Sequence, residues 1–153
     1  MKIAKLIATS FGAGFIPVAP GTFGALVGLL FSYLLSLANI GYQYFQIVHI
    51  GLIIISYFLG VYACKKLENE WGQDPSKVVI DETLGFWISI LFLPVNIYIF
   101  IAGFVLFRFF DILKPLGIRK IDLMHTLHSV MLDDVLAGIY ANIVLQIYVF
   151  YYL

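Results

Sequence analysis

Five acidic side chains stand where long apolar runs of this sequence begin or end: Asp81, Glu82, Asp111, Asp133 and Asp134. Their apolar flanks place them at helix ends. A carboxylate there must be solvated, paired or bound to a cation, because burying an isolated ion is costly. Several carboxylates together repel one another, and oxygen ligands favour Mg²⁺, with Mn²⁺ as an alternative. The set therefore predicts a metal site, although each acid alone fits equally well as a helix cap or an ion-pair partner.

Two basic side chains near Asp111 are candidates for binding phosphate. Arg108 precedes Asp111 by three residues, so the two share a face if they lie on one helix. Arginine binds phosphate through two parallel hydrogen bonds, but an ion pair within the helix is an equally good interpretation. Lys114 follows Asp111 by three residues, and Pro115 is expected to end the helix there.

A segment rich in glycine and proline, residues 12–22, ends at Gly21 and Thr22. We expect Thr22 to cap the following helix, since threonine is a favoured N-cap. Gly21 allows close approach of the backbone, and the free N–H groups of a helix start attract anions. Phosphate binding fits this pattern, and a capped loop without a ligand fits the motif alone somewhat better.

Other catalytic groups have weak support in the sequence. His125 and His128 have the spacing of a zinc-binding or proton-transferring pair, but a polar segment at the membrane surface is the simpler interpretation. The single cysteine, Cys64, is not followed by the arginine of a Cys-x5-Arg phosphate loop, and the sequence has neither a Gly-x-Ser-x-Gly motif nor a P-loop. For a hydrolase, metal-activated water is the remaining simple route.

The composition is that of a membrane protein. Of the 153 residues, 62% are hydrophobic and 12% are charged, whereas soluble domains carry about 25% charged residues. The mean hydropathy is +0.99. Uncharged runs cover residues 6–63, 83–107 and 135–153, and a membrane helix needs about 20 such residues. The net charge of zero gives no indication of nucleic-acid binding.

We expect an all-α, polytopic membrane bundle of about five helices in a single domain, residues 1–153. The first run predicts helices at about 23–37 and 45–63, and the last run predicts one more. The middle run is either one span or a hairpin that turns at Pro94, with arms at about 78–93 and 97–113. Only the hairpin puts all 9 lysines and arginines on one side, which the positive-inside rule makes cytoplasmic. We therefore predict the hairpin.

Several segments, in order along the chain, resemble the phosphatidylglycerophosphatase A family of bacterial membrane enzymes. They are Gly12 to Gly24, Asp74-Pro75 with Val79 to Glu82 and Gly85, Phe107 to Pro115, and Met131 to Gly138. The last two segments are the most specific. Where the family usually has a glycine-rich stretch, this sequence has Met124 to Ser129. The resemblance implies a Mg²⁺-dependent phosphatase that removes the terminal phosphate of phosphatidylglycerol phosphate.

The resulting hypothesis is hydrolysis of a phospholipid phosphomonoester at the cytoplasmic face of a bacterial inner membrane. Its site residues fall into three groups: the catalytic acids Asp81, Asp111, Asp133 and Asp134, the metal ligands Asp81, Glu82, Asp111, Asp133 and Asp134, and the phosphate-binding Gly21, Thr22, Arg108 and Lys114. Neighbours on a helix point about 100° apart. We therefore expect one member of each acidic pair to reach the metal, with Glu82 and Asp134 the weaker candidates.

Two other classes of function remain open at this stage. Acidic side chains in a membrane protein also serve proton or cation relays in small transporters, although a relay needs ionisable groups in mid-membrane. The second alternative is a lipid-binding protein that keeps the motifs without turnover. The sequence does not indicate an oligomeric state.

Overall fold

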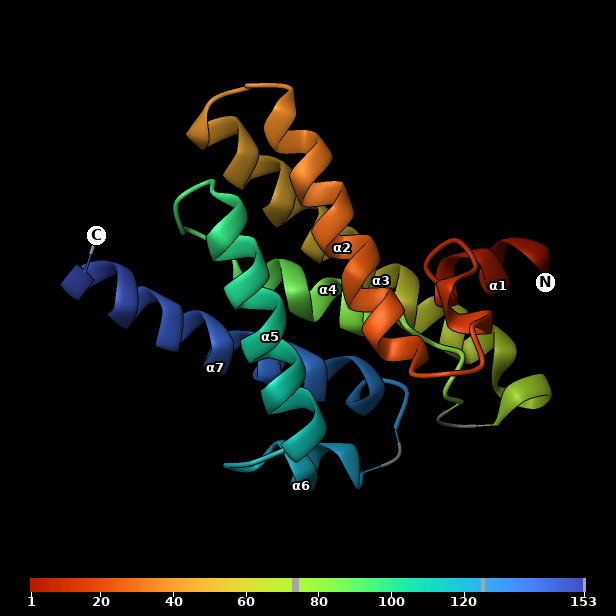
Figure 1. Ribbon diagram of the computed structural model, residues 1–153. Helices are drawn as coiled ribbons and strands as arrows, with labels where there is room; N and C mark the ends of the chain where they lie inside the picture. The colour runs from red at the N-terminus through yellow and green to blue at the C-terminus, as the bar shows by residue number, and fades with distance from the viewer. Residues whose placement is uncertain (73–74, 125, 153) are drawn as a thin grey trace.

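The computed structural model describes residues 1–72, 75–124 and 126–152, and its elements are helical (Figure 1). Their order is α1 (Lys2–Ala8), the 3-10 helix η1 (Ala13–Phe15), α2 (Pro20–Leu37), α3 (Tyr42–Trp71), α4 (Ile80–Ser89), α5 (Ile97–Leu113), α6 (Ile118–Asp122) and α7 (Ser129–Tyr152). Among the described residues, α2, α3 and α7 are long and apolar enough to cross a bilayer. The all-α prediction is confirmed. The expected number of about five membrane helices is not confirmed, because three of the described helices qualify as candidate spans by length and composition.

The middle apolar run folds as two helices and not as one long span. Between them, α4 ends at Ser89 and α5 begins at Ile97, and the connection contains Pro94, which cannot donate a backbone hydrogen bond. Asn96 caps α5, because its side chain accepts a hydrogen bond from the Tyr98 N–H at 2.8 Å. The predicted break at Pro94 is therefore confirmed, and the second arm has the predicted bounds.

The helix boundaries differ from the prediction in several places: α3 begins at Tyr42 and not at about residue 45, and α4 covers Ile80–Ser89 and not 78–93. Two other differences have a clear local cause. Ala19, and not Thr22, is the N-cap of α2, and Thr22 lies in its first turn. The reason is Pro20, whose fixed φ and missing N–H suit the first helical position. The second is the last residue of α3, which is Trp71 and not residue 63. The helix continues because the lysine and glutamate residues in this extension are good helix formers.

The short helix α4 lies at the centre of the bundle, packed against α2, α3, α5 and α7 (Figure 1). Small residues allow this approach: a Cβ at Gly24 of α2 would lie 2.6 Å from the Val79 carbonyl oxygen. Hydrogen bonds then fix the pair of helices. Thr83 donates to the Gly24 carbonyl at 2.8 Å, and the Trp87 indole donates to the Gly28 carbonyl at 3.1 Å. The start of α4 is thereby held against the start of α2.

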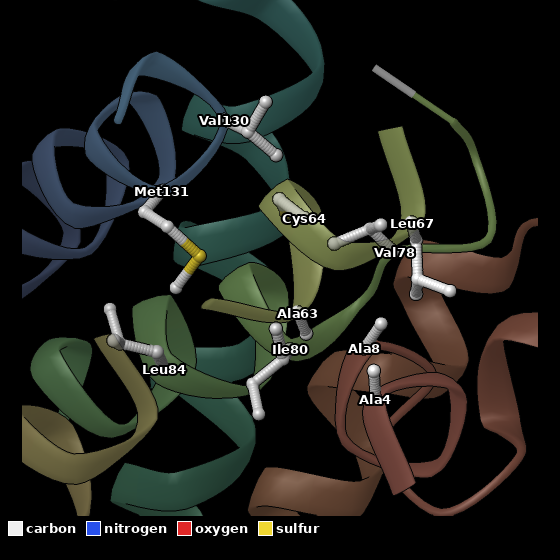
Figure 2. Packing of buried hydrophobic residues seen from close by; sticks show 10 residues of the cluster. All are labelled: Ala4, Ala8, Ala63, Cys64, Leu67, Val78, Ile80, Leu84, Val130 and Met131. Carbon is white, nitrogen blue, oxygen red and sulfur yellow. The ribbon is translucent and has the colours of Figure 1, made fainter. Parts of the chain in front are cut away.

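The first turns of α7 are anchored by an apolar cluster that joins α1, α3, α4 and α7 (Figure 2). Figure 2 shows the Met131 side chain extending from α7 toward Leu84 of α4, and both are fully buried. Cys64 is a buried member of the same cluster, as expected for a small packing residue. This cluster sets the position of the Asp133–Asp134 pair relative to α4.

Candidate active site

The five predicted acids come from the ends of three helices. Asp81 and Glu82 lie in the first turn of α4, where the positive end of the helix dipole favours carboxylates. Asp111 lies in the last turn of α5, and Asp133 and Asp134 follow the first turn of α7. The packing of α4 against α5 and α7 brings these three helix ends together.

A pocket of about 110 Å³ lies where they meet. It is lined by Pro75, Ser76, Val78, Asp81, Glu82, Asp111, Lys114, Asp122, Ser129, Val130, Asp133 and Asp134. All five predicted acids are in this lining. Sequence reasoning missed Asp122 and Ser129, and helical spacing would not have found Asp122, because Pro115 and Gly117 interrupt the chain between Lys114 and α6.

Three of the carboxylates can reach one cation. Asp81, Glu82 and Asp134 each offer an oxygen, and these oxygens lie within 4.8 Å of one another. Both members of the Asp81–Glu82 pair take part, despite their different directions from the helix. Glu82 and Asp134, which we expected to be the weaker candidates, are thus two of the three residues that the fold brings together.

The negative charges of these three carboxylates require a positively charged partner. Asp81 is 7% exposed and Asp134 is 3% exposed. Asp81 lies in α4, outside the three candidate membrane spans. Burial, together with the Glu82 and Asp134 charges, raises the pKa of Asp81 well above its usual range. Buried oxygens of Glu82, Asp133 and Asp134 have no hydrogen-bond partner. A divalent cation fits this donor set, because it would neutralise the repulsion and complete the coordination of these oxygens.

Arg108 and the start of α2 meet beside these acids. Arg108 donates a hydrogen bond from Nη1 to Asp111 Oδ2, so the ion-pair interpretation is confirmed. Its Nε is buried and has no partner. A Cβ at Gly21 would overlap Glu82 Oε1 and lie 3.0 Å from Arg108 Nη1. The backbone at Gly21 therefore touches two predicted site residues, and Thr22 follows it in the same turn.

Lys114 is held by two carboxylates. Its Nζ donates to Asp122 at 2.5 Å and to Asp133 at 2.6 Å. Burial alone would lower the pKa of Lys114, but these two interactions outweigh it and raise the pKa. Asp133 is thereby directed toward Lys114, while its neighbour Asp134 joins the group of three. A role for Lys114 in phosphate binding stays a prediction.

His128, the member of the histidine pair that the structure describes, is not part of this pocket. His128 Nδ1 and the Tyr57 hydroxyl share a hydrogen bond of 3.0 Å, and the His128 ring stacks on the Tyr57 ring. His128 is absent from the pocket lining. His125 and Asp74, which the sequence analysis also named, lie outside the described residues.

Comparison with known proteins identifies close relatives. The model of a family described as phosphatidylglycerophosphatase A matches residues 6–149. A Bacteroides thetaiotaomicron protein, provisionally named a phosphatidylinositol-3-phosphatase, is 43% identical over 145 residues, covering 93% of this chain and 91% of the relative. Phosphatidylglycerophosphatase A of Escherichia coli is 36% identical over 137 residues (88% and 76%), and that of Haemophilus influenzae is 41% identical over 142 residues (91% and 84%). No solved structure matches the chain.

Proposed function

Because this chain belongs to the phosphatidylglycerophosphatase A family, we propose that it converts phosphatidylglycerol phosphate to phosphatidylglycerol and phosphate. As a member of this family it is a phosphatase. The observation that carries the proposal is the group formed by Asp81, Glu82 and Asp134, whose oxygens lie within 4.8 Å of one another beside the cationic Arg108. Carboxylates for a cation and an arginine for an anion are the two requirements of phosphoryl transfer assisted by a metal.

Asp81, Glu82 and Asp134 would hold Mg²⁺, or Mn²⁺ in its place. When bound, such an ion supplies a water of lowered pKa and neutralises charge on the phosphate. In the reaction, the oxygen of a water molecule forms a bond to phosphorus and gives up one proton. The bond from phosphorus to the glycerol oxygen breaks, and the glycerol oxygen takes up a proton. Two pocket acids, Asp122 and Asp133, stand beside the Lys114 ammonium. We assign the proton transfer to Asp133, which is the more buried of the two.

Arg108 is assigned to the phosphate group. Its guanidinium is oriented by Asp111 and lies against the backbone at Gly21, and its unpartnered Nε leaves a donor for a phosphate oxygen. An arginine fixed in this way stabilises negative charge that develops on the phosphate in the transition state. The Gly21 N–H in the first turn of α2 would add a further donor. The Thr22 N–H already donates to the Ala19 carbonyl at 2.9 Å, so Thr22 would contribute through its hydroxyl.

The proposed location is the bacterial cytoplasmic membrane, with the pocket facing the cytoplasm. Supporting this, the pocket is bordered by the charged segments around α6 and the α3–α4 connection, and positively charged segments are retained on the cytoplasmic side. The phosphate of a phospholipid lies at that surface, while its acyl chains remain in the hydrocarbon.

The transporter alternative has little support. The candidate spans α3 and α7 carry their acidic and basic residues toward one end, from Lys65 to Glu70 in α3 and at Asp133 and Asp134 in α7. The histidine that lies away from these ends is His49 of α3, which is buried. Both of its ring nitrogens are already engaged, Nε2 with Ser32 Oγ and Nδ1 with the Phe45 carbonyl, each at 2.8 Å. This pattern fits a structural tie between α2 and α3 better than a proton relay.

The substrate assignment is tested by supplying two lipids in parallel. The purified protein is given phosphatidylglycerol phosphate or phosphatidylinositol 3-phosphate in detergent micelles with Mg²⁺, and released phosphate is measured. We expect faster release from phosphatidylglycerol phosphate. Release from the inositol lipid alone would show that the substrate assignment is wrong, and release from neither would favour a member of the family without turnover on these lipids.

A further inference from the structure

A second depression in the protein, separate from the acidic pocket, is an apolar groove of about 250 Å³ between α3, α4 and α7. Its walls include Ile54 and Phe58 of α3, Leu84 of α4, and Leu132 and Val135 of α7. Ile54 is 52% exposed and Phe58 is 67% exposed, so the groove is open at the outer surface of the helix bundle, beside α3. Because α3 and α7 are candidate membrane spans, we expect lipid hydrocarbon at this opening.

The groove and the acidic pocket lie on two sides of the same stretch of α7. Leu132 and Val135 are three residues apart and share a face, while Asp133 and Asp134 between them point elsewhere on the helix. Val130, which lines the acidic pocket, and Val135 are separated along the helix by only about 8 Å. A single lipid molecule is long enough to occupy both places.

A polar pair stands at the end of the groove nearest the start of α7. Tyr57, which lines the groove, forms a hydrogen bond through its hydroxyl with His128 Nδ1 at 3.0 Å. His128 directly precedes Ser129, and Ser129 lines the acidic pocket. The groove therefore has a polar pair at the end that leads toward Ser129 of the pocket, and such a pair suits the glycerol and ester groups that join a headgroup to its acyl chains.

We propose that this groove holds one acyl chain of the phospholipid whose terminal phosphate occupies the acidic pocket, with the Tyr57–His128 pair beside the polar linkage. This proposal rests on the proposed function for the identity of the lipid. In a bilayer, an acyl chain gains no hydrophobic free energy by leaving lipid for a protein groove. Its contribution is orientation, because a chain held in one groove limits where the phosphate can lie.

Cross-linking tests occupancy of the groove without requiring turnover. A phosphatidylglycerol with a diazirine in one acyl chain is photolysed with the protein in micelles, and labelled residues are located by mass spectrometry. We expect labelling to concentrate on the groove residues of α3 and α7. Ile54→Trp, which fills the groove, should reduce this labelling by about tenfold, equivalent to ~1.4 kcal/mol. The matched control is Ile101→Trp on α5, where Ile101 is 49% exposed and lies outside the groove.

Turnover gives a second, independent readout. Ile54→Trp should lower kcat/KM for long-chain phosphatidylglycerol phosphate by about tenfold, because the phosphate is less well placed. It should leave unchanged the hydrolysis of glycerophosphoglycerol phosphate, the same headgroup without acyl chains. Three results would overturn the proposal. The first is equal labelling of α3, α5 and α7, and the second is an equal loss of kcat/KM on both substrates. The third is a dimer of the protein that Ile54→Trp dissociates. If the unmodified protein releases no phosphate, the proposed function fails, and cross-linking still decides whether the groove holds a chain.

Discussion

Replacing Asp134 by asparagine is expected to lower phosphate release by about 10³-fold, the upper range for removing one charged or polar group that acts in the transition state. Asp134 is the α7 member of the group that also contains Asp81 and Glu82. Asparagine has nearly the same shape but lacks the negative charge that attracts a cation. Initial rates of phosphate release from phosphatidylglycerol phosphate micelles, at saturating Mg²⁺, measure the effect.

The same substitution should not destabilise the protein. One oxygen of Asp134 is buried without a partner close to other carboxylates, so removing its charge relieves repulsion in metal-free buffer. We expect the thermal unfolding midpoint with EDTA to be equal to or above that of the unmodified protein. The matched control is Glu70→Gln, because Glu70 pairs with Lys5 outside the pocket and should keep its activity. An Asp134→Asn protein with near-normal turnover would remove Asp134 from the site.

Adding one methyl group at Gly21 is expected to lower turnover by about 10²-fold. A Cβ there would overlap Glu82 Oε1 and lie 3.0 Å from Arg108 Nη1, so Gly21→Ala must displace Glu82, Arg108 or the start of α2. Misplacing a catalytic group by about 1 Å can cost two orders of magnitude. The measurement is kcat and KM for phosphatidylglycerol phosphate at several Mg²⁺ concentrations.

The control for Gly21→Ala is the same change at Gly51 of α3. A Cβ at Gly51 meets no other atom within 4 Å, and alanine in place of glycine within a helix is more favourable by up to ~1 kcal/mol. Gly51→Ala should therefore retain full activity and equal or higher thermal stability. Equal activities of Gly21→Ala and Gly51→Ala would contradict the close contact between α2 and the acidic group.

Local chemistry made much of this site predictable from the sequence. The five acids could be recognised because charged residues are scarce in an apolar chain, and their flanks placed them at helix ends. Pro94, together with the distribution of lysine and arginine, correctly favoured two helices over one long span. The adjacent position of Arg108 and Asp111 on α5 followed from helical spacing alone.

The parts that were missed depend on tertiary structure. Gly21 and Glu82 are 61 positions apart in the sequence, and no periodicity indicates that the start of α2 packs on the start of α4. Asp122 reaches Lys114 only because the chain turns back after Pro115. The cap of α2 was misplaced for a local reason, since the preference of Pro20 for the first helical turn outweighed that of Thr22 for the cap position.

The proposed reaction depends most on a divalent cation held by Asp81, Glu82 and Asp134, and one measurement tests this directly. Phosphate release from phosphatidylglycerol phosphate in micelles is followed with Mg²⁺, then after excess EDTA, and again after Mg²⁺ is restored. We expect turnover that disappears on chelation and returns with Mg²⁺. Turnover that continues at its full rate in excess EDTA would contradict the proposed reaction, because the acidic group would then have to act without a metal.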